Sequence, residues 1–135
     1  MKRFLFILSI IILPDGLLGQ TVEYFTVMMN YQHYSNGVPD GSPIISYRKD
    51  TITITPQSIS LTNYVYGTKK TSTFRITSIE NNVYTCQVDE VESYKVCVKD
   101  GFVFVECFIG RDLFSLRKYL INPKRIKLPI HNYKG

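Results

Sequence analysis

The sequence predicts an all-β protein, an antiparallel meander of about seven to eight strands that forms a curled sheet or a small barrel. Three observations indicate this class. Thr, Ile, Val, Tyr and Phe are abundant and Trp is absent, a composition that favours strands. Runs of alternating polar and apolar residues recur at intervals of about ten residues, with turn residues between them. Asp100-Gly101 joins two such runs, and this dipeptide is a strong hairpin signal.

The hairpin around Asp100-Gly101 is the element on which the predicted sheet is centred. With a two-residue loop, Lys95 lies directly across from Glu106. Opposite charges in such cross-strand pairs contribute about 0.2–1 kcal/mol. Residues 102–109 are apolar on both faces, so we expect a central strand with protein packed against each side of it.

Residues 1–19 have the pattern of an export signal peptide. Lys2 and Arg3 provide a positively charged start, and the run from Phe4 to Leu13 contains one polar residue. This run is about half as long as the ~20 residues that a membrane-spanning helix needs. We therefore expect an exported protein, periplasmic or secreted, that is not an integral membrane protein after signal removal. An uncleaved N-terminal anchor is the alternative.

The rest of the chain suits a single β domain, residues 20–121, followed by a basic C-terminal tail, residues 122–135. Alternations such as T-I-T-I-T give the first strands one apolar and one hydroxyl face, which is typical of a half-solvated antiparallel sheet. The first half of the domain is predicted to contain a strand at 21–31, a Gly- and Pro-rich loop at 32–43, strands at 44–49, 51–55 and 58–62 with turns near 50 and at 56–57, and a strand end running into a basic loop at 63–71.

The second half of the domain is predicted to contain a strand at 72–80, a turn at 81–82, a strand at 83–88, an acidic loop at 89–93 and then the central hairpin. Residues 112–121 fit either a final strand or a short C-terminal helix, because their apolar residues match both spacings. We favour the strand, since Gly110-Arg111-Asp112 can form a hairpin loop. We expect Asn122-Pro123 to end this element.

Charge is distributed unevenly along the chain. Residues 20–110 hold seven Lys or Arg and nine Asp or Glu, whereas residues 111–135 hold seven Lys or Arg and one acidic residue, Asp112. A basic arm of this kind can contact an anionic surface such as phospholipid or acidic glycan. The plainer interpretation is a solvated end that maintains solubility. Export and the absence of a recognisable binding module argue against nucleic acid as a partner.

Cys86, Cys97 and Cys107 are three thiols, an odd number. In the hairpin register, Cys97 and Cys107 point to opposite faces. If Cys86 shares the face of Cys107, the two lie two strands apart, about 9–10 Å, which exceeds the ~7 Å limit for a disulfide. We therefore expect buried free thiols and no disulfide. A competing register of residues 83–88 places Cys86 opposite Cys97, where a cross-strand bond is conceivable.

Patterns that carry catalysis or metal binding are not found. His33 and His131 have no partner at metal-ligand spacing, and C-x-x-C does not occur. The acidic cluster at 89–92 lacks the ligand order of a calcium loop. No Gly-rich phosphate loop or nucleophile motif is present. We therefore expect no catalytic residues, no metal and no cofactor, and a protein that is not an enzyme.

Aromatic residues are the remaining candidates for a binding surface. Rings with a polar tip suit recognition surfaces, and a face of phenylalanines requires a cover. We expect the curled sheet itself or the C-terminal segment to be that cover, with an apolar ligand or a partner subunit as the alternative. The candidates for a ligand or partner face are Phe102, Phe104, Phe108, Tyr31, Tyr34, Tyr64 and Tyr66.

These observations predict an exported non-catalytic β module that binds a protein partner or a small apolar or glycan ligand. The alternative is a structural or inhibitory exported protein that acts through an exposed edge strand or through loop 32–43. An export signal followed by a β meander resembles many small exported bacterial β proteins and lipocalin-type barrels. No motif assigns the chain to either group.

Overall fold

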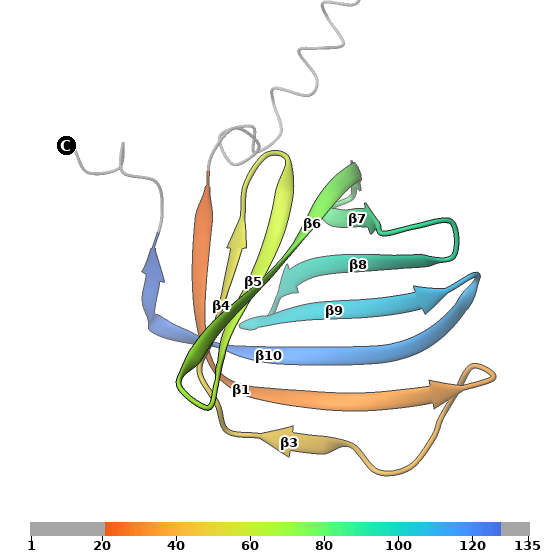
Figure 1. The fold of residues 1–135 in the computed structure, drawn as a ribbon, viewed down its shortest axis with the longest axis horizontal. Helices are drawn as coiled ribbons and strands as arrows, with labels where there is room; N and C mark the ends of the chain where they lie inside the picture. The colour runs from red at the N-terminus through yellow and green to blue at the C-terminus, as the bar shows by residue number, and fades with distance from the viewer. Residues whose placement is uncertain (1–20, 128–135) are drawn as a thin grey trace, which may run out of the picture.

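The computed structural model describes residues 21–127, which form an antiparallel sheet that closes into an eight-strand barrel (Figure 1). The predicted all-β class is confirmed, and the stretch for which a helix was the alternative lies in a strand. The strands are β1 (Val22–Ser35), β2 (Val38–Pro39), β3 (Ile44–Ser46), β4 (Asp50–Ile54), β5 (Ser58–Val65), β6 (Thr68–Glu80), β7 (Val83–Gln87), β8 (Glu92–Lys99), β9 (Phe102–Ile109) and β10 (Asp112–Lys127).

The barrel runs β1-β4-β5-β6-β7-β8-β9-β10, and β10 pairs with β1 to close it. From β4 onward each strand pairs with the next along the chain, as a meander predicts. Strands β2 and β3 pair with β1 alone and extend the sheet beside the barrel. The long β1 and β10 thus form the seam between the two ends of the domain.

Four of the hairpin turns are specified by their residues. Each turn has two consecutive residues with positive φ, the conformation that a type I′ turn requires. Asn, Asp and Gly adopt this conformation at low energetic cost. Tyr66, which is not one of these residue types, has a φ of 52°, and its side chain is fully exposed. The four pairs are Asn36-Gly37, Tyr66-Gly67, Asn81-Asn82 and Asp100-Gly101.

The β8–β9 hairpin has the register that the Asp100-Gly101 turn predicts, with Lys95 opposite Glu106. The two side chains nevertheless form no ion pair, and none joins them to another described residue. Instead, the Lys95 ammonium lies 5.5 Å from the centroid of the Phe108 ring. We therefore place the contribution of this cross-strand pair at the low end of the ~0.2–1 kcal/mol range.

The hydrophobic core fills part of the barrel interior. Alternate residues of each strand point inward, so every barrel strand except β6 contributes at least one buried side chain to it. A fully buried aliphatic side chain stabilises the fold by about 1.5–3 kcal/mol relative to an exposed one. The buried members are Met29, Ile52, Ile54, Ile59, Cys86, Val96, Val103, Val105, Tyr119 and Ile121.

Strand β9 does not have protein packed on both faces, and that expectation is wrong. Val103 and Val105 enter the barrel, whereas Phe102 and Phe104 lie outside it and are partly exposed. A curled sheet encloses one face only, and no described strand crosses the other. The Lys118 ammonium lies there, 4.8 Å from the Phe102 ring and 5.7 Å from the Phe104 ring.

Two segments predicted as loops are strands. The basic segment 68–71 is the beginning of β6, and it pairs residue by residue with β5. The Tyr66-Gly67 turn makes this pairing possible, and its dipeptide is not one of the familiar hairpin signals. Strand β1 extends to Ser35, so the first four residues of the predicted loop 32–43 are strand, and the loop also contains β2.

Asn122-Pro123 does not end the last strand, contrary to expectation. The pairing of β10 with β1 shifts register between Ile121 and Ile126. Pro123 lies in this irregular stretch, where its missing N–H is not needed by the ladder. The backbone N–H of Lys124 donates to Asn122 Oδ1 at 3.0 Å and closes a local turn. Figure 1 shows that β10 bends sharply before its end.

The predicted export signal, residues 1–19, lies outside the described residues, as does His131 together with most of the basic tail. Export and the contact of the tail with an anionic surface therefore stay predictions. Between residues 21 and 127 there is no helix that is long and apolar enough to cross a membrane.

Candidate functional site

A cavity of about 150 Å³ lies beside the hydrophobic core, inside the barrel. Strand β6 pairs with β5 alone as far as Arg75 and joins β7 only from Ile76 onward. The β5–β6 hairpin is therefore a free rim next to the cavity. Residues from five strands and the β3–β4 connection line it: Arg48, Asp50, Leu61, Thr62, Asn63, Ser72, Phe74, Tyr94, Arg117 and Tyr119.

Arg117 is the central cation of this site. It lies on the inward face of β10, and its guanidinium is hydrogen-bonded to the Tyr119 side chain. Burial alone lowers the pKa of Arg117, but the oxygens of Tyr119, Tyr94 and Tyr31 reverse this effect and raise the pKa above its ordinary value. The guanidinium is therefore charged at neutral pH. No carboxylate of the described residues pairs with it.

Asp50 is a buried carboxylate, 6% exposed, at the beginning of β4. Its Oδ2 accepts a hydrogen bond from Arg48 Nε at 2.9 Å. The backbone of Asp50 is held by Thr26, whose hydroxyl donates to the Asp50 carbonyl oxygen at 3.1 Å. The second carboxylate oxygen, Oδ1, is buried and has no hydrogen-bond donor. A buried acceptor without a donor costs about 1–3 kcal/mol.

Asn63 presents a second acceptor of the same kind. Its Oδ1 is buried without a donor, and Asn63 and Asp50 are the two residues of the described chain with such an atom. They lie on neighbouring strands, one position beyond the Thr51–Thr62 pair. The residues that line the cavity therefore include two with an acceptor that lacks a donor and one cation that lacks an anion. Native proteins leave few buried polar groups in this condition.

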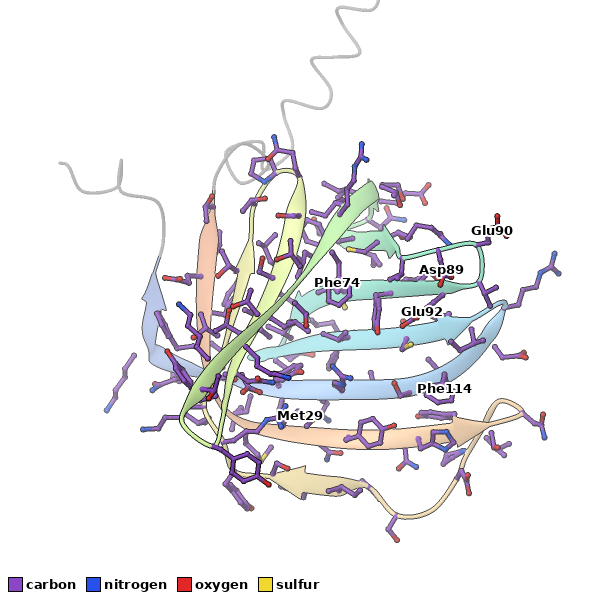
Figure 2. All side chains as sticks on the ribbon, in the orientation of Figure 1. Met29, Phe74, Asp89, Glu90, Glu92 and Phe114 are labelled. Atoms are coloured by element: carbon purple, nitrogen blue, oxygen red, sulfur yellow. The ribbon has the colours of Figure 1, made fainter. Side chains whose placement is uncertain are left out.

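The opposite wall of the cavity is aromatic. Phe74 packs on Tyr94 with ring centroids 4.7 Å apart and planes at 45°, and Figure 2 shows Phe74 projecting from β6 toward β8. The Tyr94 hydroxyl donates to Glu92 Oε2 at 2.8 Å. Burial, followed by this hydrogen bond, raises the pKa of Tyr94 far above its ordinary value. Tyr94 is therefore neutral and its proton is already donated.

The structure separates the seven aromatic residues that the sequence marked as candidates. Phe102, Phe104 and Phe108 lie on the outer face of β9. Tyr34 lies at the β1–β2 hairpin, and Tyr64 and Tyr66 are exposed near the β5–β6 turn. Tyr31 packs against the core and lies near Arg117. Tyr31 alone of the seven therefore belongs to the surroundings of the cavity.

The residues that carry the polar chemistry of the cavity were not singled out from the sequence. In residues 112–121 the apolar Phe114, Leu116 and Leu120 attract notice, yet Leu116 and Leu120 face outward, because it is Arg117 that lies opposite the inward Val105. Phe114 lies at the β10 bulge, where its ring centroid is 4.8 Å from that of His33. Arg117 could have been identified from the alternation of inward and outward residues along β10. Assigning the inward face requires the β9–β10 register, and a bulge in β10 shifts that register.

The acidic loop and the histidine that the sequence offered have local structural roles. Asp89 Oδ1 accepts the backbone N–H groups of Glu92 at 2.7 Å and Val91 at 2.8 Å, and these bonds lower the pKa of Asp89. His33 Nδ1 lies 3.2 Å from Asp40 Oδ2 near the end of β1. In the part of the chain described by the structure, no group of three or more His, Cys, Asp or Glu could hold a metal.

The three cysteines are free thiols. Cys86 lies opposite Tyr94, and Tyr94 lies opposite Cys107. Cys86 and Cys107 therefore share the inward face two strands apart, as the favoured register predicted, and the register that paired Cys86 with Cys97 is wrong. Burial raises the pKa of the Cys86 thiol to about 11, so this thiol is a small hydrophobic side chain at neutral pH.

No protein-family model, curated protein or solved structure matches this chain. The geometry of the cavity and the chemistry of its lining therefore carry the functional argument.

Proposed function

We propose that the protein is an exported, non-catalytic binding module that holds a small ligand in the cavity inside its barrel. The observation that carries this proposal is that residues lining one cavity lack partners: Asp50 Oδ1 and Asn63 Oδ1 have no hydrogen-bond donor, and the Arg117 guanidinium has no carboxylate among the described residues. Small-molecule sites are typically concave, with a few convergent polar groups in a largely apolar wall. A ligand that forms hydrogen bonds or an ion pair with these groups removes the free-energy penalty of leaving them unpartnered, and this favours binding.

The size of the cavity limits the ligand. A volume of about 150 Å³ is well below the ~300–1,000 Å³ of sites for drug-sized molecules. A protein cavity of about this volume holds benzene, so the enclosed part of the ligand has roughly six to eight non-hydrogen atoms. A glycan could place only one small group here, and a long apolar chain would extend past the rim.

Closing the cavity tests this function. Ser72 lines the cavity from the rim, whereas the neighbouring Thr73 points to the outer face, where its hydroxyl lies 3.0 Å from that of Ser60. We expect Ser72→Trp to fill the cavity and Thr73→Trp to leave it open. Native mass spectrometry after incubation with a small-molecule extract of the host measures the retained mass.

The wild-type chain and Thr73→Trp should carry an added mass that Ser72→Trp lacks. The proposal is overturned if the wild type retains nothing, or if Ser72→Trp retains as much as the wild type. Circular dichroism of the three proteins verifies that each is folded.

A second candidate function is supported by the free edge of β3. This strand pairs with β1 alone, and both Ile44 and Ile45 are at least 50% exposed. An apolar edge strand can receive an extended segment of a partner protein, as a structural or inhibitory protein would require. Ile44→Lys should abolish such an interaction in a pull-down from host extract and leave small-ligand retention unchanged.

A further inference from the structure

The charges inside the cavity indicate the chemical class of the ligand. We propose that the cavity binds a small hydroxylated monocarboxylate, with the carboxylate on Arg117 and the hydroxyl groups donating to Asp50 and Asn63. This inference rests on the proposed function and names the ligand that it requires.

The first step is the missing anion. Arg117 is half-buried in the barrel, its described neighbours include tyrosine side chains and the Cys107 thiol, and no carboxylate of the described residues lies within ion-pair distance of it. Charged side chains inside proteins are normally paired, because an unpaired charge in a poorly solvated site is costly. The planar guanidinium presents parallel N–H donors that match the two oxygens of a carboxylate. A ligand carboxylate therefore supplies the partner that the described chain does not.

The second step is the charge balance. Arg48 and Asp50 neutralise each other through their 2.9 Å contact, so the lining residues leave one positive charge, that of Arg117. A ligand with a single negative charge balances it. A phosphate monoester carries about −1.5 to −2 at pH 7 and would place excess negative charge beside Asp50. An amino acid would bring its ammonium group beside Arg48.

The third step is the pair of acceptors. The free oxygens of Asp50 and Asn63 come from adjacent strands and need O–H or N–H donors. Hydroxyl groups supply them without adding charge. Leu61 and Phe74, which also line the cavity, can cover the carbon atoms of the ligand.

Three small molecules separate these contributions. D-Glycerate has a carboxylate and two hydroxyl groups, propionate keeps the carboxylate without hydroxyl groups, and glycerol keeps hydroxyl groups without the carboxylate. We expect glycerate to bind the full chain about tenfold more tightly than propionate or glycerol, because each of these leaves a charged or buried group unpartnered. Titrations followed by NMR chemical shifts measure the three dissociation constants.

Two variants locate the interaction. Arg117→Met should weaken glycerate binding about ten- to a hundredfold, since a hydrogen bond to a charged group is lost. Lys118→Met is the matched control, because Lys118 carries the same charge one residue further along β10 but lies over the outer phenylalanines. Its affinity for glycerate should equal that of the wild type.

Thermal unfolding separates a binding role from a structural one. Loss of a half-buried cation that has no ion-pair partner should leave the Tm of the ligand-free Arg117→Met variant at or above that of the wild type. The ligand class is overturned if glycerate does not bind, if propionate or glycerol binds equally well, or if Arg117→Met loses Tm but keeps its affinity for glycerate. The proposed function survives these results if Ser72→Trp still abolishes retention of a host ligand, and it fails separately if no host ligand is retained.

Discussion

The apolar end of the barrel interior and its cavity end are built by the same strands but differ in chemistry. On β4, Ile52 and Ile54 are 0% and 5% exposed, and the next inward residue toward the cavity is Asp50. On β5, Ile59 is 1% exposed, and Asn63 lies four residues further on. Moving a few residues along each strand therefore changes the interior from a hydrophobic core to a polar region with acceptors that lack donors.

This difference shows how stabilising and destabilising contributions are distributed in the barrel. The apolar end buries aliphatic side chains, each stabilising the fold by about 1.5–3 kcal/mol. The cavity end holds two buried acceptors without donors, which each cost about 1–3 kcal/mol. Binding sites commonly retain such locally unfavourable arrangements because a stable scaffold offsets them.

The largest expected effect compares core with cavity directly. Ile52→Ala should lower the free energy of unfolding by about 2–5 kcal/mol, since Ile52 is fully enclosed and its loss leaves a void. Leu61→Ala should cost roughly half as much, because Leu61 is partly exposed and already borders the cavity. Urea denaturation measures both. Equal losses would mean that the cavity end is packed as tightly as the core.

An intermediate effect is expected at the junction of the two regions. Thr26→Val removes the hydroxyl that donates to the Asp50 carbonyl oxygen at 3.1 Å and accepts the Asp50 N–H at 3.3 Å. Because Thr26 is 1% exposed, we expect a loss of about 1–3 kcal/mol in the same assay. Thr53→Val, on the outer face of β4, is the control and should stay within about 0.5 kcal/mol of wild type.

The pH dependence of stability should report the burial of Cys86. Its pKa is about 11 in the folded protein against 9.0 for an unburied thiol. From pH 9 to 11 the unfolded chain loses this proton while the folded chain retains it, so stability falls as pH rises. Cys86→Val should show a shallower decline, by roughly 1–2 kcal/mol over this window. Denaturation curves of both proteins at pH 8, 9, 10 and 11 measure it; parallel declines would contradict the buried, protonated thiol.

The smallest effect is expected outside the barrel. Glu106 faces Lys95 across the β8–β9 hairpin without an ion pair, so Glu106→Gln should change the free energy of unfolding by less than about 0.5 kcal/mol. A loss above about 1 kcal/mol at low salt that vanishes at high salt would show that this outer pair does stabilise the fold.

Local features of the fold followed from the sequence because they depend on neighbouring residues. The β8–β9 register, the turns at Asn81-Asn82 and Asp100-Gly101, and the strand character of β10 were all predicted and are confirmed. The Tyr66-Gly67 turn and the continuation of β10 past Pro123 were not predicted. Both depend on pairing with another strand, which overrides the usual meaning of these residues.

The sequence alone determined that this chain forms antiparallel strands and tight turns, because alternation and turn chemistry act over a few residues. Only the tertiary structure decided which face of each strand is enclosed. That choice depends on the pairing of β10 with β1, for example Met29 with Tyr119, between opposite ends of the domain. Closure turns Val103 and Arg117 inward and Phe102 outward, and it thereby creates both the core and the cavity.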